Sequence, residues 1–199
     1  MSVSVFEARK KRALERLRIG GADEEVARII ERINRLEEFF TTSSCAGRIV
    51  LMCIPEMGAK REAKFIAVWH RPVMREEVLE SVTSAGKGEI WLLSQSPIVH
   101  VACRSLERAK TLLRIAIESG FKYSSIKAIS RDNEKVMVEV MSTERMDVPL
   151  GKDGVWFCSE AYMNFIVSKA NFSLHRGKEK LERFYHGLKE LEKIKTAPP

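Results

Sequence analysis

The apolar run Ile49–Ile54 constrains the fold of this chain more than any other stretch of its sequence. Successive side chains of a strand point to opposite faces of the sheet, so a strand that is apolar at every position has both faces covered. Pro55 follows the run directly. We therefore expect a strand over residues 48–54 at the centre of a sheet, followed by a turn.

The residues before this run form a dense group of small polar side chains. They read Phe39-Phe40-Thr41-Thr42-Ser43-Ser44-Cys45-Ala46-Gly47-Arg48. Hydroxyl side chains satisfy backbone groups in loops, glycine lets the chain bend, and the planar arginine fork suits a carboxylate or a phosphate. An ordinary polar turn explains the same residues, so their spacing alone leaves both a turn and a binding loop open.

The rest of the chain predicts a repeated order of two strands and one helix. Two helices come first, over 5–18 and 24–38, and Asp23 is well suited to cap the second. Short hairpins imply antiparallel pairing, with the helices as crossovers. We therefore expect an α+β fold whose mixed, largely antiparallel sheet curls into a barrel-like core with helices outside. Further strands are expected over 64–70, 89–95, 98–104, 124–130 and 135–141, and further helices over 74–83 and 105–119.

At 199 residues the chain is long enough for a single domain with its own core. Its expected parts are helices within 1–40, the strand-strand-helix core over 41–157, and a long helix over 159–195 that Ser159 caps. Residues 146–154 contain a proline and two glycines and are expected to form a loop. The leucines of the long helix keep nearly a heptad period. We expect this helix to pack on the N-terminal helices in a monomer, with a dimer zipper as the alternative.

The net charge indicates the kind of partner, and the cysteines indicate the cellular compartment. The formal net charge of +7 favours an anionic partner, and nucleic acid is the commonest one, although solubility alone explains such a charge too. The four cysteines show no Cys-x-x-Cys spacing, so we expect reduced thiols in a cytoplasmic protein and no metal site. No apolar run approaches 18 residues and no signal-peptide core is apparent, which predicts no membrane span.

Two histidines are candidates for chemistry. His100 shares one face of its strand with Arg104, while Val99, Val101 and Cys103 share the other face. The face of His100 otherwise holds Ile98 and Ala102. Burying an imidazole on it costs free energy unless this face opens into a polar pocket. His70 stands at the end of another strand. Each is either a hydrogen-bonded structural residue or a catalytic one, and the sequence leaves this open. The glycine fingerprints of dinucleotide and nucleoside triphosphate sites are absent.

Several separated motifs, in order, resemble the tRNA wybutosine-synthesizing protein 3 family, and the likeness runs over about residues 26–191. After Gly120-Phe121-Lys122 this chain has Tyr123-Ser124-Ser125 where the family usually has Asn-Ser-Gly. The segments that carry the resemblance are 40–48, Trp69-His70-Arg71, Ile98-Val99-His100-Val101-Ala102-Cys103-Arg104, 105–109, 118–122, Asp147-Val148-Pro149-Leu150-Gly151 and 159–162.

The resemblance implies a methyltransferase without the Rossmann fold that uses S-adenosylmethionine. Its substrate would be the N4 atom of a tricyclic wyosine intermediate beside the anticodon of tRNA(Phe), and the runner-up is a non-catalytic module that binds the anticodon loop for another enzyme. A proton must leave the ring nitrogen, a task for a histidine near neutral pH. The expected catalytic residues are His70 and His100. The expected donor-binding residues are Ser43, Ser44, Cys45, Gly47, Arg48 and Ser124, and the expected tRNA-binding residues are Trp69, Arg71, Arg104, Phe121 and Lys122.

Overall fold

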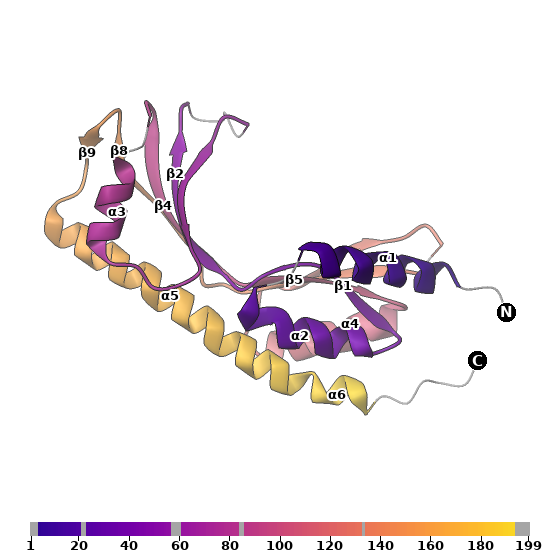
Figure 1. Cartoon of the computed structure of the whole chain (residues 1–199). Coiled ribbons are helices and arrows are strands. Elements are labelled where there is room, and N and C mark those ends of the chain that lie inside the picture. The colour runs from indigo at the N-terminus through magenta and orange to yellow at the C-terminus, as the bar shows by residue number, and fades with distance from the viewer. Residues whose placement is uncertain (1–3, 21–22, 57–60, 84–85, 133, 194–199) are drawn as a thin grey trace. The chain divides into compact units, whose positions relative to one another are not determined.

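The computed structural model of the chain describes residues 4–20, 23–56, 61–83, 86–132 and 134–193 (Figure 1). The chain divides into two compact units, which we call unit 1 and unit 2. Unit 1 takes Met1–Ala46, Pro97–Thr143 and Lys178–Pro199, and unit 2 takes Gly47–Ser96 and Glu144–Gly177. The long helix α5 (Glu160–Gly187) contributes residues to both. Neither unit is one continuous segment, and the single domain stays a prediction.

Unit 1 is built on a four-stranded sheet of order β1-β5-β7-β6 in which all neighbours are antiparallel. One face of this sheet packs against α2, α4 and the end of α5, through valines of the central strands and residues such as Ile29, Leu112 and Phe184. The strands are β1 (Phe39–Cys45), β5 (Ile98–Cys103), β6 (Ser125–Ile129) and β7 (Val136–Met141), and the helices that lie wholly in unit 1 are α1 (Val5–Gly20), α2 (Glu24–Arg35), α4 (Leu106–Glu118) and α6 (Lys189–Glu192).

The opposite face of this sheet is covered in part by α1. Phe6 of α1 is buried and its ring meets the ring of Phe40 at 5.1 Å between centroids, and Ala102 lies in the same cluster. Their neighbours on the same sheet include polar side chains, which are described below as the candidate site.

Unit 2 is built on a five-stranded sheet of order β3-β2-β4-β8-β9, again antiparallel throughout. The apolar run forms β2, which pairs with strands on both sides and buries Ile49 and Leu51, so the central strand is confirmed. The core continues into α5 through Met163, Ile166 and neighbours. The elements are β2 (Arg48–Ile54), β3 (Lys64–Trp69), α3 (Arg75–Val82), β4 (Glu89–Gln95), β8 (Met146–Lys152) and β9 (Val155–Trp156).

The α+β class and the antiparallel pairing are confirmed, and the topology is not that of a Rossmann fold. The prediction of one mixed, barrel-like sheet is wrong, because the strands form two sheets that do not close and contain only antiparallel pairs. Of the long C-terminal helix expected over 159–195, residues 160–187 form α5 and residues 189–192 form α6, while 194–195 lie outside the described residues. No helix in the described part of the chain is both long and apolar enough to cross a membrane.

Two segments expected as loops are strands. Residues 39–45 form β1 because the strand buries Phe39, Phe40 and Thr41 while β5 supplies its hydrogen bonds. Residues 146–152 form β8, where a bulge in the β4–β8 pairing falls beside Pro149. A Cβ atom at Gly151 would stand 2.3 Å from the carbonyl oxygen of Val155, so glycine is what lets β9 approach.

Candidate active site

One row of polar residues crosses all four strands of the unit 1 sheet. Ser43 of β1 pairs with His100 of β5, His100 pairs with Glu139 of β7, and Glu139 pairs with Ser125 of β6. We call these four residues the polar row. The pairing places them side by side, although they come from segments up to 96 positions apart (139 − 43).

Hydrogen bonds join three members of the polar row. The Oγ atom of Ser43 lies 2.8 Å from Nδ1 of His100, and Nε2 of His100 lies 2.9 Å from Oε2 of Glu139. The other carboxylate oxygen of Glu139 is 2.6 Å from Nζ of Lys127. The imidazole is therefore held at both nitrogens, between an exposed hydroxyl and a nearly buried carboxylate.

The state of Glu139 decides which imidazole nitrogen carries the proton. Burial raises the pKa of this carboxyl, but the hydrogen bonds and charges of Lys127 and His100 outweigh burial and leave the pKa below its usual range. An ionised carboxylate only accepts hydrogen bonds, so Nε2 of His100 donates to it. In the neutral imidazole, Nδ1 is then an acceptor for the hydroxyl hydrogen of Ser43. That is the state of a general base.

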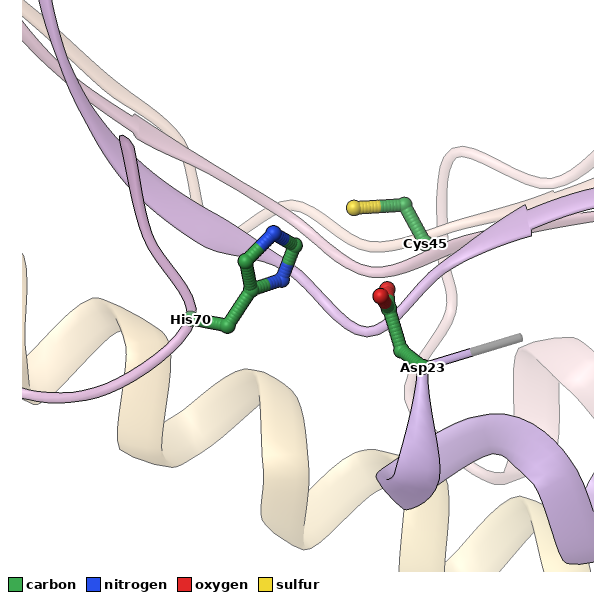
Figure 2. Close-up of side chains that lie close together, drawn as sticks. All are labelled: Asp23, Cys45 and His70. Atoms are coloured by element: carbon green, nitrogen blue, oxygen red, sulfur yellow. The ribbon is translucent and has the colours of Figure 1, made fainter. Parts of the chain in front are cut away.

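Local structure fixes Ser43 and the turn that follows β1. The register of β1 against β5 shifts between Thr41 and Ser43, and the bulge presents Ser43 to the imidazole. The backbone N–H of Ala46 donates to Oδ2 of Asp23 at 2.8 Å. The carboxylate of Asp23 therefore holds the turn after β1. It makes no side-chain hydrogen bond that caps α2, although Asp23 directly precedes that helix. The same carboxylate lies within 4.8 Å of Sγ of Cys45. Figure 2 draws both side chains as sticks.

The glycine and arginine after this turn begin unit 2. Gly47 has a φ of +92°, the left-handed conformation expected of a glycine that lets the chain bend. Arg48 donates from Nε to Oε1 of Gln95 at 2.7 Å, and its guanidinium lies 5.4 Å from the ring centroid of Phe65. The hydrogen bond to Gln95 uses only Nε of the guanidinium. The two terminal nitrogens are suited to hold a carboxylate or a phosphate.

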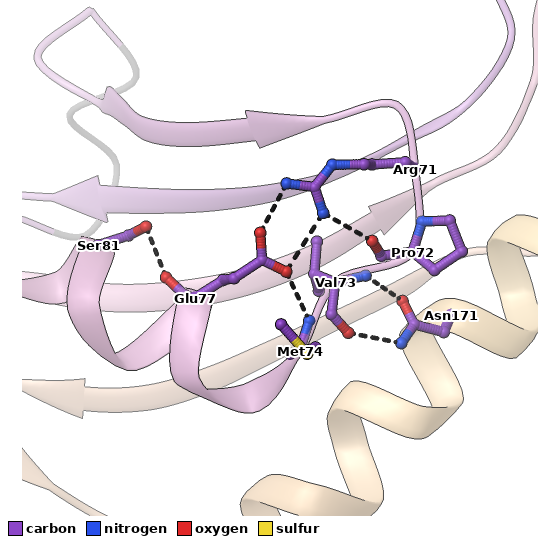
Figure 3. Close-up of polar contacts among 7 residues, drawn as sticks. All are labelled: Arg71, Pro72, Val73, Met74, Glu77, Ser81 and Asn171. Atoms are coloured by element: carbon purple, nitrogen blue, oxygen red, sulfur yellow. Dashed lines mark hydrogen bonds and ion pairs between the residues drawn. The ribbon is translucent and has the colours of Figure 1, made fainter.

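The expected motif Trp69-His70-Arg71 lies at the end of β3 in unit 2. Trp69 is half-buried against the core of this unit, and His70 is exposed. Arg71 forms a two-pronged ion pair with Glu77, with distances of 2.6 and 3.2 Å (Figure 3). The guanidinium also donates to the carbonyl of Pro72. This arginine already has protein partners, which hold the segment before α3.

The carboxylate of Glu77 should make the stability of the fold depend on pH. The Arg71 guanidinium and the N–H of Met74 lower the pKa of Glu77 from 4.5 to about 2. A lowered folded-state pKa contributes stability above the unfolded value, and this contribution is lost as pH falls from about 4.5 to about 2. We expect Glu77→Gln to lower the Tm at neutral pH, with the gap to wild type closing over that interval. Thermal unfolding across pH checks this, with the exposed Glu80→Gln on the same helix as control; a gap that is constant with pH would contradict it.

Three of the expected tRNA-binding residues lie in unit 1, and they differ in how far their side chains are exposed to a ligand. Phe121 is fully buried, with its ring 5.6 Å from the ring of Phe184, so the expectation that it stacks on a base is wrong. Arg104 is half-exposed and ion-paired with Glu38 at 3.2 Å. Lys122 is exposed.

Ser124, an expected donor-binding residue, already has a backbone partner. Its Oγ accepts a hydrogen bond from the N–H of Met141 at 3.1 Å, which ties the start of β6 to the end of β7. Its neighbour Ser125 belongs to the polar row, at the opposite edge of the four-stranded sheet from Ser43.

The sequence interpretation missed Glu139 and Lys127. The signal for Glu139 is present in the sequence, since it is the only charged residue in the strand Val136–Met141. A single carboxylate in such a strand calls for a charged or hydrogen-bonding neighbour. Lys127 has no comparable signal, because an exposed lysine on an edge strand is ordinary.

Comparisons with known proteins agree with this picture. The family profile described as "Methyltransferase TYW3" matches residues 7–190. A Pyrococcus horikoshii protein named tRNA(Phe) 7-((3-amino-3-carboxypropyl)-4-demethylwyosine(37)-N(4))-methyltransferase 1 is 48% identical, over 89% of this chain and 92% of its own length. A Methanocaldococcus jannaschii protein, named as the corresponding methyltransferase, is 38% identical over 92% of this chain and 97% of its own length.

Two solved structures share the fold of this chain. A protein of Pyrococcus horikoshii superposes with a TM-score of 0.86 at 46% identity, covering 92% of this chain and 95% of that one. A hypothetical protein of Aeropyrum pernix superposes with a TM-score of 0.74 at 31% identity, covering 85% and 98%. The match runs through both units, and with the family profile it shows that this chain belongs to the TYW3 methyltransferase family.

Proposed function

We propose that this protein transfers a methyl group from S-adenosylmethionine to N4 of 7-(3-amino-3-carboxypropyl)-4-demethylwyosine at position 37 of tRNA(Phe), in the cytoplasm. The observation that carries the proposal is the imidazole of His100 held between Ser43 and Glu139 in a chain of this family. The names of relatives that are 38–48% identical support the substrate and the position methylated.

The polar row supplies the proton acceptor that methylation of a ring nitrogen needs. The new bond would join the methyl carbon to N4 as the bond between that carbon and the sulfonium sulfur breaks and S-adenosylhomocysteine leaves, and the proton on N4 must go to a base. The hydroxyl of Ser43 is exposed and donates to Nδ1 of His100. We infer that Ser43 takes the N4 proton as it passes its own to Nδ1, while Glu139 holds the resulting imidazolium at Nε2.

The chemistry of the expected donor-binding residues fits S-adenosylmethionine. This donor carries a carboxylate and ribose hydroxyls beside the sulfonium that supplies the methyl group. Arg48 offers a guanidinium fixed at Nε, which suits the carboxylate. Ser44 and Cys45 are half-buried on β1, where short polar side chains can meet hydroxyl groups. His70 remains the second candidate base, and Trp69 remains a candidate for stacking on the modified base.

The electrostatics support tRNA as the partner. The formal net charge is +7, and α1 carries several arginines. Arg9, Arg12 and Arg16 of α1 line a groove of about 260 Å³ together with Thr42 and Lys135. Cationic side chains along a groove can bind the backbone phosphates of a nucleic acid. Such contacts position the nucleic acid but do not depend on its sequence.

A methyl-transfer assay tests this function against the non-catalytic alternative. The purified protein is incubated with methyl-labelled S-adenosylmethionine and tRNA(Phe) that carries the demethylated precursor. We expect label in the tRNA, and a Tm that rises with donor concentration in the absence of tRNA. A protein that binds this tRNA, transfers no label and shows no donor-dependent Tm would be a binding module, and the proposed function would be wrong.

A further inference from the structure

The part of α5 that belongs to unit 2 exposes a line of large aromatic side chains. Tyr162, Phe165 and Phe172 are 46%, 55% and 62% exposed. Their spacing of three and seven residues places them on one face of the helix, and Lys169 lies on the same face between the two phenylalanines. We call these four residues the aromatic stripe. The helix itself is labelled in Figure 1.

The core of unit 2 does not use this stripe. The helix buries its other face against the five-stranded sheet, through Met163, Ile166, Val167, Ala170 and Leu174. None of the three exposed rings belongs to the hydrophobic cluster that holds α5 in place. A contiguous set of large apolar side chains on a protein surface usually marks a binding site.

The charges around the stripe specify the chemistry of the partner. The chain has 27 acidic residues, yet none occurs from Ala161 to Lys178. The same segment carries Lys169 and Arg176, and Nζ of Lys169 lies 5.0 Å above the ring of Phe165. The segment therefore offers flat aromatic surfaces and positive charge with no carboxylate of its own, a combination by which proteins bind single-stranded nucleic acid.

We propose that the aromatic stripe is a stacking platform for unpaired nucleotides of the RNA substrate. It rests on the proposed function only for the class of substrate, which is RNA. A symmetric contact with a second copy fits less well, because it would bring the cations of one helix to the same cations of another. An acidic protein would satisfy the charge but would leave the row of rings without a stacking partner. Unpaired bases satisfy both features.

Direct binding measurements test the platform. A fluorescently labelled oligouridylate and a duplex RNA of equal length are titrated with the full-length protein and with Phe165→Ala/Phe172→Ala. We expect the double variant to bind the single strand about tenfold more weakly and the duplex almost unchanged. Phe165→Leu/Phe172→Leu keeps the apolar surface but removes the π-faces, and should lose nearly as much affinity. Lys169→Glu should also weaken binding, with a smaller salt dependence.

Matched controls and competing outcomes complete the test. Ile117→Ala and Lys110→Glu change exposed residues of another helix, α4, and should bind as wild type does. Circular dichroism checks that each variant is folded. Full affinity in the leucine variant, concentration-dependent self-association of wild type that the alanine variant loses, or wild-type binding of the single strand by the alanine variant would each overturn the platform.

The platform and the proposed function fail differently. If only the platform is wrong, the alanine variant binds the single strand as wild type does, and wild type still transfers methyl groups. If only the proposed function is wrong, wild type transfers no methyl group, while the alanine variant still loses single-strand affinity.

Discussion

We expect His100→Ala to slow methyl transfer by about a hundredfold or more at saturating donor and tRNA, and to leave the affinity for both within about twofold of wild type. In the proposed mechanism the imidazole would accept a proton at Nδ1 through Ser43, to which it is hydrogen-bonded, while the hydrogen bond to Glu139 would hold Nε2. Removal of the ring leaves the hydroxyl without an acceptor, but it removes no group that binds the donor. Single-turnover kinetics with equilibrium binding measurements separates these two effects.

Variants of the two residues that are hydrogen-bonded to His100 test whether this histidine acts as a base. Ser43→Ala should slow transfer as well, because it removes the hydroxyl between substrate and imidazole. Glu139→Gln keeps a hydrogen-bond partner for Nε2 but loses the negative charge beside it, so its rate of methyl transfer should fall as well, but less than that of His100→Ala. His186→Ala near the end of α5 is the control and should keep wild-type rates.

His70 is the competing base. If His70→Ala lowers the rate as predicted for His100→Ala, and His100→Ala leaves it unchanged, then the proton leaves through His70. In that case the hydrogen bonds of the polar row serve only to hold the four-stranded sheet together. Normal rates in both variants would show that neither imidazole is needed.

The local elements were predictable because their patterns are local. The alternation in the strand Ile98–Cys103 separates buried valines from His100, and Ser105 caps α4 by accepting from the N–H of Arg108. The strand at Phe39–Cys45 was not predictable in this way, because short hydroxyl side chains suit turns as well as strands. Its strand state depends on pairing with β5, more than fifty residues further along the chain.

The two sheets were missed because short connections were read as hairpins. β4 ends at Gln95 and β5 begins at Ile98, yet β4 pairs with β2 and β8, while β5 pairs with β1 and β7. The turn between them contains Pro97. β1 and β2 are also joined by a short connection and lie in different sheets, and Gly47 takes its positive φ there. A connection of two residues permits a hairpin but does not require one.

The site was predictable where one residue is incompatible with its own strand, and not where a distant partner decides. His100 on an otherwise apolar strand indicated a polar pocket, and the structure supplies Ser43 and Glu139 on the neighbouring strands. The partners of Arg71 and Arg104 are carboxylates that the sequence does not point to. An arginine in a motif can therefore bind a substrate or hold the fold, and its sequence context is the same in both cases.

Phe121→Ala gives the second large effect, a loss of about 3–5 kcal/mol in the free energy of unfolding. The side chain is fully buried beside Phe184, and the backbone of this residue follows Gly120, which has a φ of +100°. Truncation therefore leaves a cavity between α4 and the end of α5 in the core of unit 1. Guanidinium denaturation followed by circular dichroism measures the change.

Two further variants distinguish a core residue from a base-stacking one at this position. Phe121→Leu restores most of the volume and should cost no more than about half as much as alanine. Tyr123→Ala, two residues further on and 60% exposed, should change stability by less than about 0.5 kcal/mol. If Phe121 stacked on RNA, alanine would weaken tRNA binding and leave unfolding unchanged. Because the ring has no exposed surface, we expect the reverse, with tRNA affinity kept under conditions where the variant remains folded.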